Sequence, residues 1–311
     1  MKKIMSEQIV DLAYSSEDKL RLDKYLTTYD TEHSRSFFQN LIEEGRILVN
    51  GRVVKANFQL SNGDNIRICY PQAQDVDILP EDISLDILYE DSEVLIVNKP
   101  KGMVVHPAAG HTSGTLVNAI MHHCKGDLSG INGEIRPGIV HRIDKDTTGA
   151  LIICKNDNAH NFIAEQISVH SVNRRYVGIV QGIIKEDEGT IRTQIARSKT
   201  DRKKMSVVKE NGRDAITHYK VLERFKNATF VEFKLETGRT HQIRVHMSYI
   251  KHPLLGDHVY GSEKLAAGYQ GQTLHAKIIG FIHPKTNEYL EVQAPIPEYF
   301  EKLLDKLRKT C

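Results

Sequence analysis

Residues 136–149 read RPGIVHRIDKDTTG and lead directly into the apolar run ALIIC at residues 150–154. The first stretch is polar and ends on a glycine, whereas the second has the apolar character and length of a buried strand. This arrangement indicates a loop held by a rigid sheet, a place where reactive side chains often lie. The loop offers histidine, arginine, aspartate and threonine. Its composition does not choose among them, because an aspartate in such a loop is more often a turn former or a cap than a catalyst.

Short strand-like segments dominate the chain from residue 85 onward, with amphipathic helices between them. The expected strands are residues 94–97, 150–154, 176–181, 215–222 and 229–235, and the expected helices lie near residues 115–124, 158–169 and 298–308. Because both kinds of element contribute, the pattern predicts an α+β domain over residues 85–311.

A smaller unit is predicted at residues 15–70. Apolar residues at helical spacing indicate two helices, the second with Ser34 as its N-cap and Gly45 as its stop. An Asn50-Gly51 pair between two short apolar runs then predicts a β-hairpin. The unit is expected to close with a strand at residues 66–70.

The remaining residues are assigned to connecting segments. Residues 1–14 are expected to form an N-terminal tail. Residues 71–84 contain two prolines and few apolar side chains, so we expect the linker between the two units there.

Composition excludes several classes of protein. The 311 residues carry 42 Lys and Arg against 40 Asp and Glu, a net charge of +2 that neither favours nor excludes a nucleic-acid partner. The four cysteines form no C-x-x-C pair, which argues against a disulfide framework or a thiolate zinc site. No run approaches the roughly 18 apolar residues of a membrane span, and the start lacks the apolar core of a signal peptide. We therefore expect a soluble, cytoplasmic protein without a membrane partner.

The smaller unit resembles the alpha-L RNA-binding domain, first described in a small-subunit ribosomal protein. The resemblance rests on RLDKYL at residues 21–26, on GRILVNG at residues 45–51 and on the order helix, helix, hairpin, strand. It implies that basic side chains of this unit lie beside RNA phosphates, namely Arg21, Lys24, Arg35, Arg46 and Arg52. The alternative is that these are ordinary solvated charges.

The larger unit resembles the RluA-type pseudouridine synthases. Besides residues 136–149, the matching blocks are VNKPKGMVVHP at residues 97–107, RY at residues 175–176 and TGRTHQIRVHM at residues 237–247. The resemblance implies a mixed, mainly antiparallel β-sheet flanked by helices. It also implies an isomerase that converts specific uridines of structured RNA to pseudouridine, with Asp144 as the catalytic carboxylate.

The same resemblance assigns roles to other residues. Arg244 is expected to stabilise the ionised form of Asp144, and Tyr176 is expected to place its ring against the uracil. Their alternatives are a surface ion pair of small worth and a core tyrosine. His141 and Arg142 are expected to contact RNA or to fill the place of the extruded base, although either could be structural. Arg239 is a further expected RNA contact.

Three competing interpretations remain. A metal site at His241 and His246 is disfavoured, because a spacing of five does not match the zinc-helix pattern. The segment KPKG at residues 99–102 lacks the spacing of a phosphate-binding loop. A ribosome-assembly protein on a catalytically inactive synthase scaffold is disfavoured by intact Asp144, Tyr176 and Arg244. We expect no cofactor and no metal, a structured RNA as partner, with large-subunit ribosomal RNA as the first choice, and a monomer.

Overall fold

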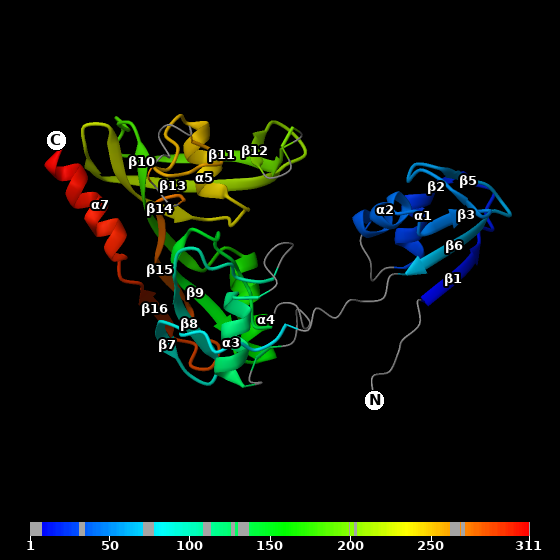
Figure 1. Cartoon of the computed structure of the whole chain (residues 1–311), viewed down its shortest axis with the longest axis horizontal. Coiled ribbons are helices and arrows are strands. Elements are labelled where there is room, and N and C mark those ends of the chain that lie inside the picture. Colours follow the sequence, from blue (N-terminus) through cyan, green and yellow to red (C-terminus); the bar gives the residue numbers. More distant parts are fainter. Residues whose placement is uncertain are drawn as a thin grey trace. The chain divides into compact units, whose positions relative to one another are not determined.

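The computed structural model divides into two compact units, Met1–Val76 and Asp77–Cys311. The structure describes residues 8–30, 35–70, 78–107, 113–125, 128–129, 137–198, 200–201, 204–261, 268 and 271–310. Ser34, residue 136, and parts of the predicted tail and linker (residues 1–7 and 71–77) lie outside these ranges. Each unit is described by itself (Figure 1).

The small unit pairs two helices with a four-stranded sheet in the order β1-β6-β3-β4. Its elements are β1 (Gln8–Ala13), β2 (Leu20–Arg21), α1 (Leu22–Tyr29), α2 (Arg35–Glu43), β3 (Ile47–Val49), β4 (Arg52–Val53), β5 (Gln59–Leu60) and β6 (Asn65–Tyr70). Leu22, Leu26 and Phe38 of the helices form one core with Ile47 and Ile68 of the sheet.

The predicted helix, helix, hairpin order of the small unit is confirmed. Asn50 and Gly51 have φ angles of 51° and 73°, as a two-residue hairpin turn between twisted strands requires. The tail prediction is wrong for residues 8–13, because this segment forms β1 and pairs antiparallel along the whole of β6. In this strand Ile9, Asp11 and Ala13 lie on one face, and Val10 and Leu12 lie on the other. The acidic Asp11 interrupts the apolar residues, which weakens the strand pattern in the sequence.

The large unit is built on one sheet in the order β12-β11-β13-β14-β10-β15-β9-β8-β7, with β16 also paired to β15. Its strands are β7 (Ile87–Glu90), β8 (Val94–Lys99), β9 (Thr148–Cys154), β10 (Asn173–Gln181), β11 (Glu188–Arg197), β12 (Met205–Val208), β13 (Arg213–Arg224), β14 (Ala228–Leu235), β15 (Leu274–Ile282) and β16 (Tyr289–Gln293). Its helices include α3 (Leu116–Cys124), α4 (Asp157–Ser168), α5 (Gln242–Tyr249) and α7 (Glu298–Lys309). Among the described residues of the large unit, every pair of named strands is antiparallel except β9 with β15, which confirms the mixed, mainly antiparallel sheet.

Helices cover both faces of the sheet near β8 and β9. Val117 and Ile120 of α3 pack with Leu151 and Ile153 of β9, whereas Ile163 of α4 packs in a second cluster with Ile152. Every residue of β9 is therefore buried, which explains the continuous apolar run at residues 150–154.

Gly149 is required where the polar loop enters β9. Its φ angle is 108°, and a Cβ at this position would overlap the backbone of Ala276 on the neighbouring strand β15. Only glycine allows this close approach in this backbone conformation. The loop that precedes β9 is thereby fixed at the seam between β9 and β15.

The linker prediction is wrong for residues 78–84. Ile78 is 5% exposed and belongs to the core of the large unit. The Asn118 side chain donates to Leu79 O at 2.8 Å, and Glu81 N donates to Asn118 O at 3.0 Å. This segment is therefore anchored to α3. One buried apolar residue, Ile78, is too weak a sequence pattern from which to predict that this segment packs on the large unit.

Candidate active site

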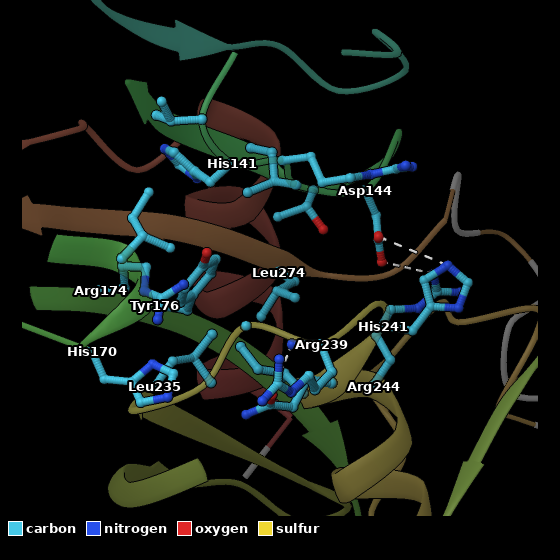
Figure 2. A pocket seen from close by; sticks show the side chains of 18 of the residues that line it. His141, Asp144, His170, Arg174, Tyr176, Leu235, Arg239, His241, Arg244 and Leu274 are labelled. Carbon is cyan, nitrogen blue, oxygen red and sulfur yellow. Dashed lines mark hydrogen bonds and ion pairs between the residues drawn. The ribbon is translucent and has the colours of Figure 1, made fainter. Parts of the chain in front are cut away.

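Three separate parts of the large unit supply the walls of one cavity. The loop before β9 contributes Asp144, strand β10 contributes Tyr176, and helix α5 contributes Arg244. The cavity has a volume of about 750 Å³, within the range of about 300–1,000 Å³ usual for ligand sites. Figure 2 shows Asp144, His241 and Arg244 on one side, and His141, Arg174 and Tyr176 on the other.

The loop that carries Asp144 is tied down through its backbone. The ammonium of Lys99 is fully buried and donates to Pro100 O, Met103 O and Lys145 O at 2.8–3.0 Å. Gly102 N donates to Lys145 O as well, at 3.0 Å. Burial lowers the pKa of Lys99 to about 7, against the opposing effect of the nearby carboxylates. These bonds hold the backbone on the C-terminal side of Asp144.

Arg244 lies between two carboxylates. Its Nε and Nη2 donate to Asp257 at 2.7 and 2.9 Å, while its Nη1 donates to Asp144 Oδ2 at 2.9 Å. Asp257 is completely buried and also accepts bonds from the backbone N–H groups of Val259 and Tyr260. Burial alone would raise the pKa of Asp257, but the bonds from Arg244 and the backbone hold it below its usual value. Asp257 therefore fixes the guanidinium and leaves one N–H edge for Asp144.

His241 lies beside the other oxygen of Asp144. The hydroxyl oxygen of Tyr260, Oη, accepts from Met205 N at 2.8 Å and lies 2.8 Å from His241 Nδ1. With the Tyr260 hydroxyl donating to Nδ1, the remaining ring N–H is on Nε2, which lies 3.8 Å from Asp144 Oδ1. Burial lowers the pKa of His241, while the Asp144 charge opposes this shift. The carboxylate thus faces a cation on one oxygen and an imidazole on the other.

Tyr176 and Arg174 supply the opposite wall. Tyr176 is 8% exposed on β10 between Phe233 of β14 and Ala276 of β15. Burial raises its pKa, so the hydroxyl is neutral. Arg174 is 6% exposed and donates from Nη2 to Glu236 O at 3.0 Å. The wall combines an aromatic face with a fixed cation.

The other predicted site residues of the large unit differ in their environments. His141 accepts a bond from Ile152 N on its Nε2 at 3.0 Å, and burial with the Arg174 charge lowers its pKa to about 3. Its ring is therefore neutral and anchors the loop to β9. Arg142 is exposed at the cavity, and Arg239 donates from Nε to Asp214 O at 2.8 Å.

The basic residues of the small unit that were predicted to contact RNA differ in their hydrogen bonds and ion pairs. Arg21 and Arg35 each donate two bonds to the buried carboxylate of Asp23, and burial opposes but does not prevent a strong lowering of the Asp23 pKa. Lys24 and Arg52 are exposed, and Arg46 pairs with Glu44 at 3.3 Å. Arg35 thus connects α2 with α1 through Asp23, whereas Arg21 bonds to Asp23 from the position directly before α1. Part of each arginine side chain stays exposed.

The histidines considered for a metal site have other partners. His246 is fully buried, and its ring nitrogens lie 2.8 and 2.9 Å from the hydroxyls of Thr217 and Thr193. Within the described ranges no group of three or more His, Cys, Asp or Glu side chains is arranged to hold a metal ion. In the same part of the chain, no helix is long and apolar enough to cross a membrane.

Asp257, Tyr260 and Arg174 were missed by the sequence analysis. Asp257 and Tyr260 come from a loop with no strong local pattern, and only the fold brings them to Arg244 and His241. Arg174 had a usable signal, since it precedes Tyr176 by two residues on one strand and so shares its face.

Known protein families, relatives and solved structures resemble this chain. A family model described as RNA pseudouridylate synthase matches residues 93–249, and an S4 domain model matches residues 20–66. A Bacillus subtilis protein described as an uncharacterized RNA pseudouridine synthase is 51% identical, with 96% of this chain and 98% of that protein covered. A ribosomal large subunit pseudouridine synthase D from Zymomonas mobilis is 45% identical, with coverages of 92% and 93%. The structure of human RNA pseudouridylate synthase domain containing 1 aligns with a TM-score of 0.58 at 25% identity, over 77% of this chain and 98% of that one.

Proposed function

Because the chain belongs to the RluA-type family of RNA pseudouridine synthases and carries an S4 domain, we propose that it converts specific uridines of structured large-subunit ribosomal RNA to pseudouridine through Asp144. Membership of this family means that the chain is an isomerase that acts on RNA. The proposal adds the catalytic group and the class of RNA. The observation that carries it is the Asp257–Arg244–Asp144 arrangement at the wall of the cavity, in which Asp257 and Arg244 are buried and Asp144 is partly exposed.

The reaction places a simple demand on the protein. The bond between N1 of uracil and C1′ of ribose breaks, the uracil turns, and C5 bonds to C1′. The proton on C5 is lost and N1 gains one, so atoms and electrons balance without an oxidant or a group donor. We therefore assign no cofactor and no metal. The carboxylate of Asp144 acts on the ribose or the base, and the bond from Arg244 Nη1 holds it in place and stabilises its negative charge.

The detached uracil must be kept in place while it turns. The ring of Tyr176 is suited to contact the flat face of the base, because it is rigid and lines the same cavity as Asp144. Arg142 is exposed at the cavity and is suited to contact the RNA backbone or the space left by the extruded base. His141 supports this segment through its bond to β9, and Arg239 supplies a further positive charge.

Ribosomal RNA is proposed on two grounds. Several relatives are described as ribosomal large subunit pseudouridine synthase D, and the S4 domain exposes basic side chains such as Lys24 and Arg52. Contacts between these charges and phosphates would add affinity for large folded RNA. We further propose that the chain works in the cytoplasm as a monomer.

A map of pseudouridines in cellular RNA, with and without the gene, tests this assignment. Pseudouridines that disappear from large-subunit ribosomal RNA and return with the wild-type gene are expected. Unchanged ribosomal RNA, with sites lost only from other RNA, would overturn the choice of substrate.

A further inference from the structure

A second cavity of about 300 Å³ adjoins the active-site cavity. It lies among the ends of β11 and β12, the turn that leads into β13, and the loop before α5. Arg213, Gly238 and Arg239 line both cavities, so these residues form the wall between them. Whatever occupies the second cavity therefore lies next to the occupant of the first.

The described lining of the second cavity is rich in cations. Arg197, Arg213 and Arg239 face it, and the described lining contains no Asp or Glu. Arg213 is exposed and has no ion-pair or side-chain hydrogen-bond partner within the described ranges. The whole chain has a net charge of only +2, so three arginines at one small cavity are a local concentration that suits an anion.

The shared wall is held in place before any ligand binds. The Gln242 side chain accepts bonds from Arg239 N at 2.9 Å and Thr237 Oγ1 at 2.8 Å, and it donates to Ile216 O at 3.0 Å. Arg239 Nε donates to Asp214 O at 2.8 Å, which orients the guanidinium and leaves its terminal nitrogens for another acceptor.

The turn that leads into β13 is equally constrained. A Cβ at Gly212 would lie 2.6 Å from Val208 Cγ2 and 2.8 Å from Gln194 Cβ. The turn before β13 is therefore packed closely against β11 and β12, and it fixes the point at which Arg213 leaves the backbone. Because the backbone on both sides and the Arg239 guanidinium are fixed before binding, mainly the exposed Arg197 and Arg213 side chains have to be ordered when an anion binds.

We propose that the second cavity binds the phosphodiester group of a nucleotide next to the target uridine, with Arg197 and Arg213 as its ligands and Arg239 between the two cavities. This inference rests on the proposed function, because an RNA chain must continue away from a uridine seated beside Asp144. A phosphodiester matches the ligand chemistry, since arginine forks bind phosphate oxygens through two parallel N–H groups.

The experiment uses the full chain and a short RNA cut from ribosomal RNA around a uridine that the wild-type chain modifies. Each phosphate near the target is replaced in turn by a neutral methylphosphonate, and the dissociation constant is measured. At one flanking position the wild-type chain is expected to lose about tenfold in affinity. Arg197→Gln and Arg213→Gln are expected to lose about as much on unmodified RNA, and nothing further from the methylphosphonate at that position.

Lys209→Gln is the matched control. Lys209 is an exposed cation after β12 that lines neither cavity, so this variant should keep the full methylphosphonate effect. The two arginine variants should also reduce the salt dependence of binding by about 0.7 in logarithmic slope, the share of one single-strand phosphate. Melting curves like that of the wild type would show that all three variants fold.

The outcomes separate the two proposals. If the wild-type chain modifies no uridine, the proposed function fails first. If it modifies one but the arginine variants lose the same affinity from every methylphosphonate as the wild type does, the subsite is overturned. Tight binding of inorganic phosphate alone at Arg197 and Arg213, without coupling to any RNA position, would assign the cavity to a free anion and also overturn the proposal.

Discussion

Asp257→Asn tests how the site holds its catalytic carboxylate. Asp257 Oδ1 accepts from Arg244 Nη2 and from the backbone of Val259 and Tyr260, while Oδ2 accepts from Arg244 Nε. An asparagine keeps the first three bonds through its carbonyl oxygen but turns an N–H group toward Arg244 Nε–H. The buried guanidinium then loses one of its two anionic partners and meets a donor in its place.

The structure sets the size of the effect. Removing one partner from a buried ion pair costs about 3–5 kcal/mol, which for a unit of this size lowers the melting temperature on the order of 10 °C. Arg244 should then turn toward Asp144 and move its carboxylate. A displacement of about 1 Å at a reacting group lowers a rate by roughly 100-fold, so the rate of the chemical step is expected to fall by that order.

The assay is single-turnover release of tritium from RNA that carries tritium at C5 of uridine, at a temperature where the variant is folded. Asp305→Asn is the control, because Asp305 pairs with Arg308 on the exposed face of α7 at 3.2 Å. That change should leave the melting temperature and the rate close to those of the wild type, because exposed ion pairs contribute little to stability. A folded Asp257→Asn chain with the wild-type rate would refute the idea that Asp257 orients Arg244 for Asp144.

Three further predictions follow from the same geometry. Activity on a pre-folded RNA should survive exhaustive treatment with EDTA, because the reaction needs no metal; activity lost and then regained with zinc alone would contradict this. A fragment of residues 78–311, which keeps the packed segment at Ile78, should fold and retain the chemical step but lose affinity and salt dependence on large structured RNA; an unchanged salt slope would mean that the small unit does not bind RNA. Burial lowers the pKa of His246 to about 4, so its contribution to stability is present above about pH 6.5 and is lost as the pH falls toward 4, by about 1.4 kcal/mol per unit; His246→Asn should flatten unfolding free energy against pH in that window, and an unaltered slope would show that the ring is not held neutral.

Local patterns predicted much of the fold. The hairpin at Asn50-Gly51 follows from a turn that few other residue pairs adopt. The apolar run at residues 150–154 became β9, and the helices near 115–124, 158–169 and 298–308 formed where amphipathic spacing indicated them. In each case a short stretch of sequence contains the physical cause of the structure.

Features that depend on distant partners were missed. Strand β15 is paired with β10, β9 and β16, and its segment was not recognised because its burial comes from all three neighbours. The same holds for the site. The loop with Asp144 and the helix with Arg244 were identified through resemblance, but Asp257 and Tyr260 act through contacts that no local spacing reveals.

The central claim is that the charge of Asp144 performs the chemistry. Asp144→Asn keeps the shape of the side chain and a bond from Arg244 Nη1, so the variant should fold and bind RNA as the wild type does. Pseudouridine formation is measured under single-turnover conditions on ribosomal RNA from cells that lack the gene. We predict no detectable product from the variant. Product formed at more than a few per cent of the wild-type rate would contradict the assignment of Asp144 as the catalytic carboxylate.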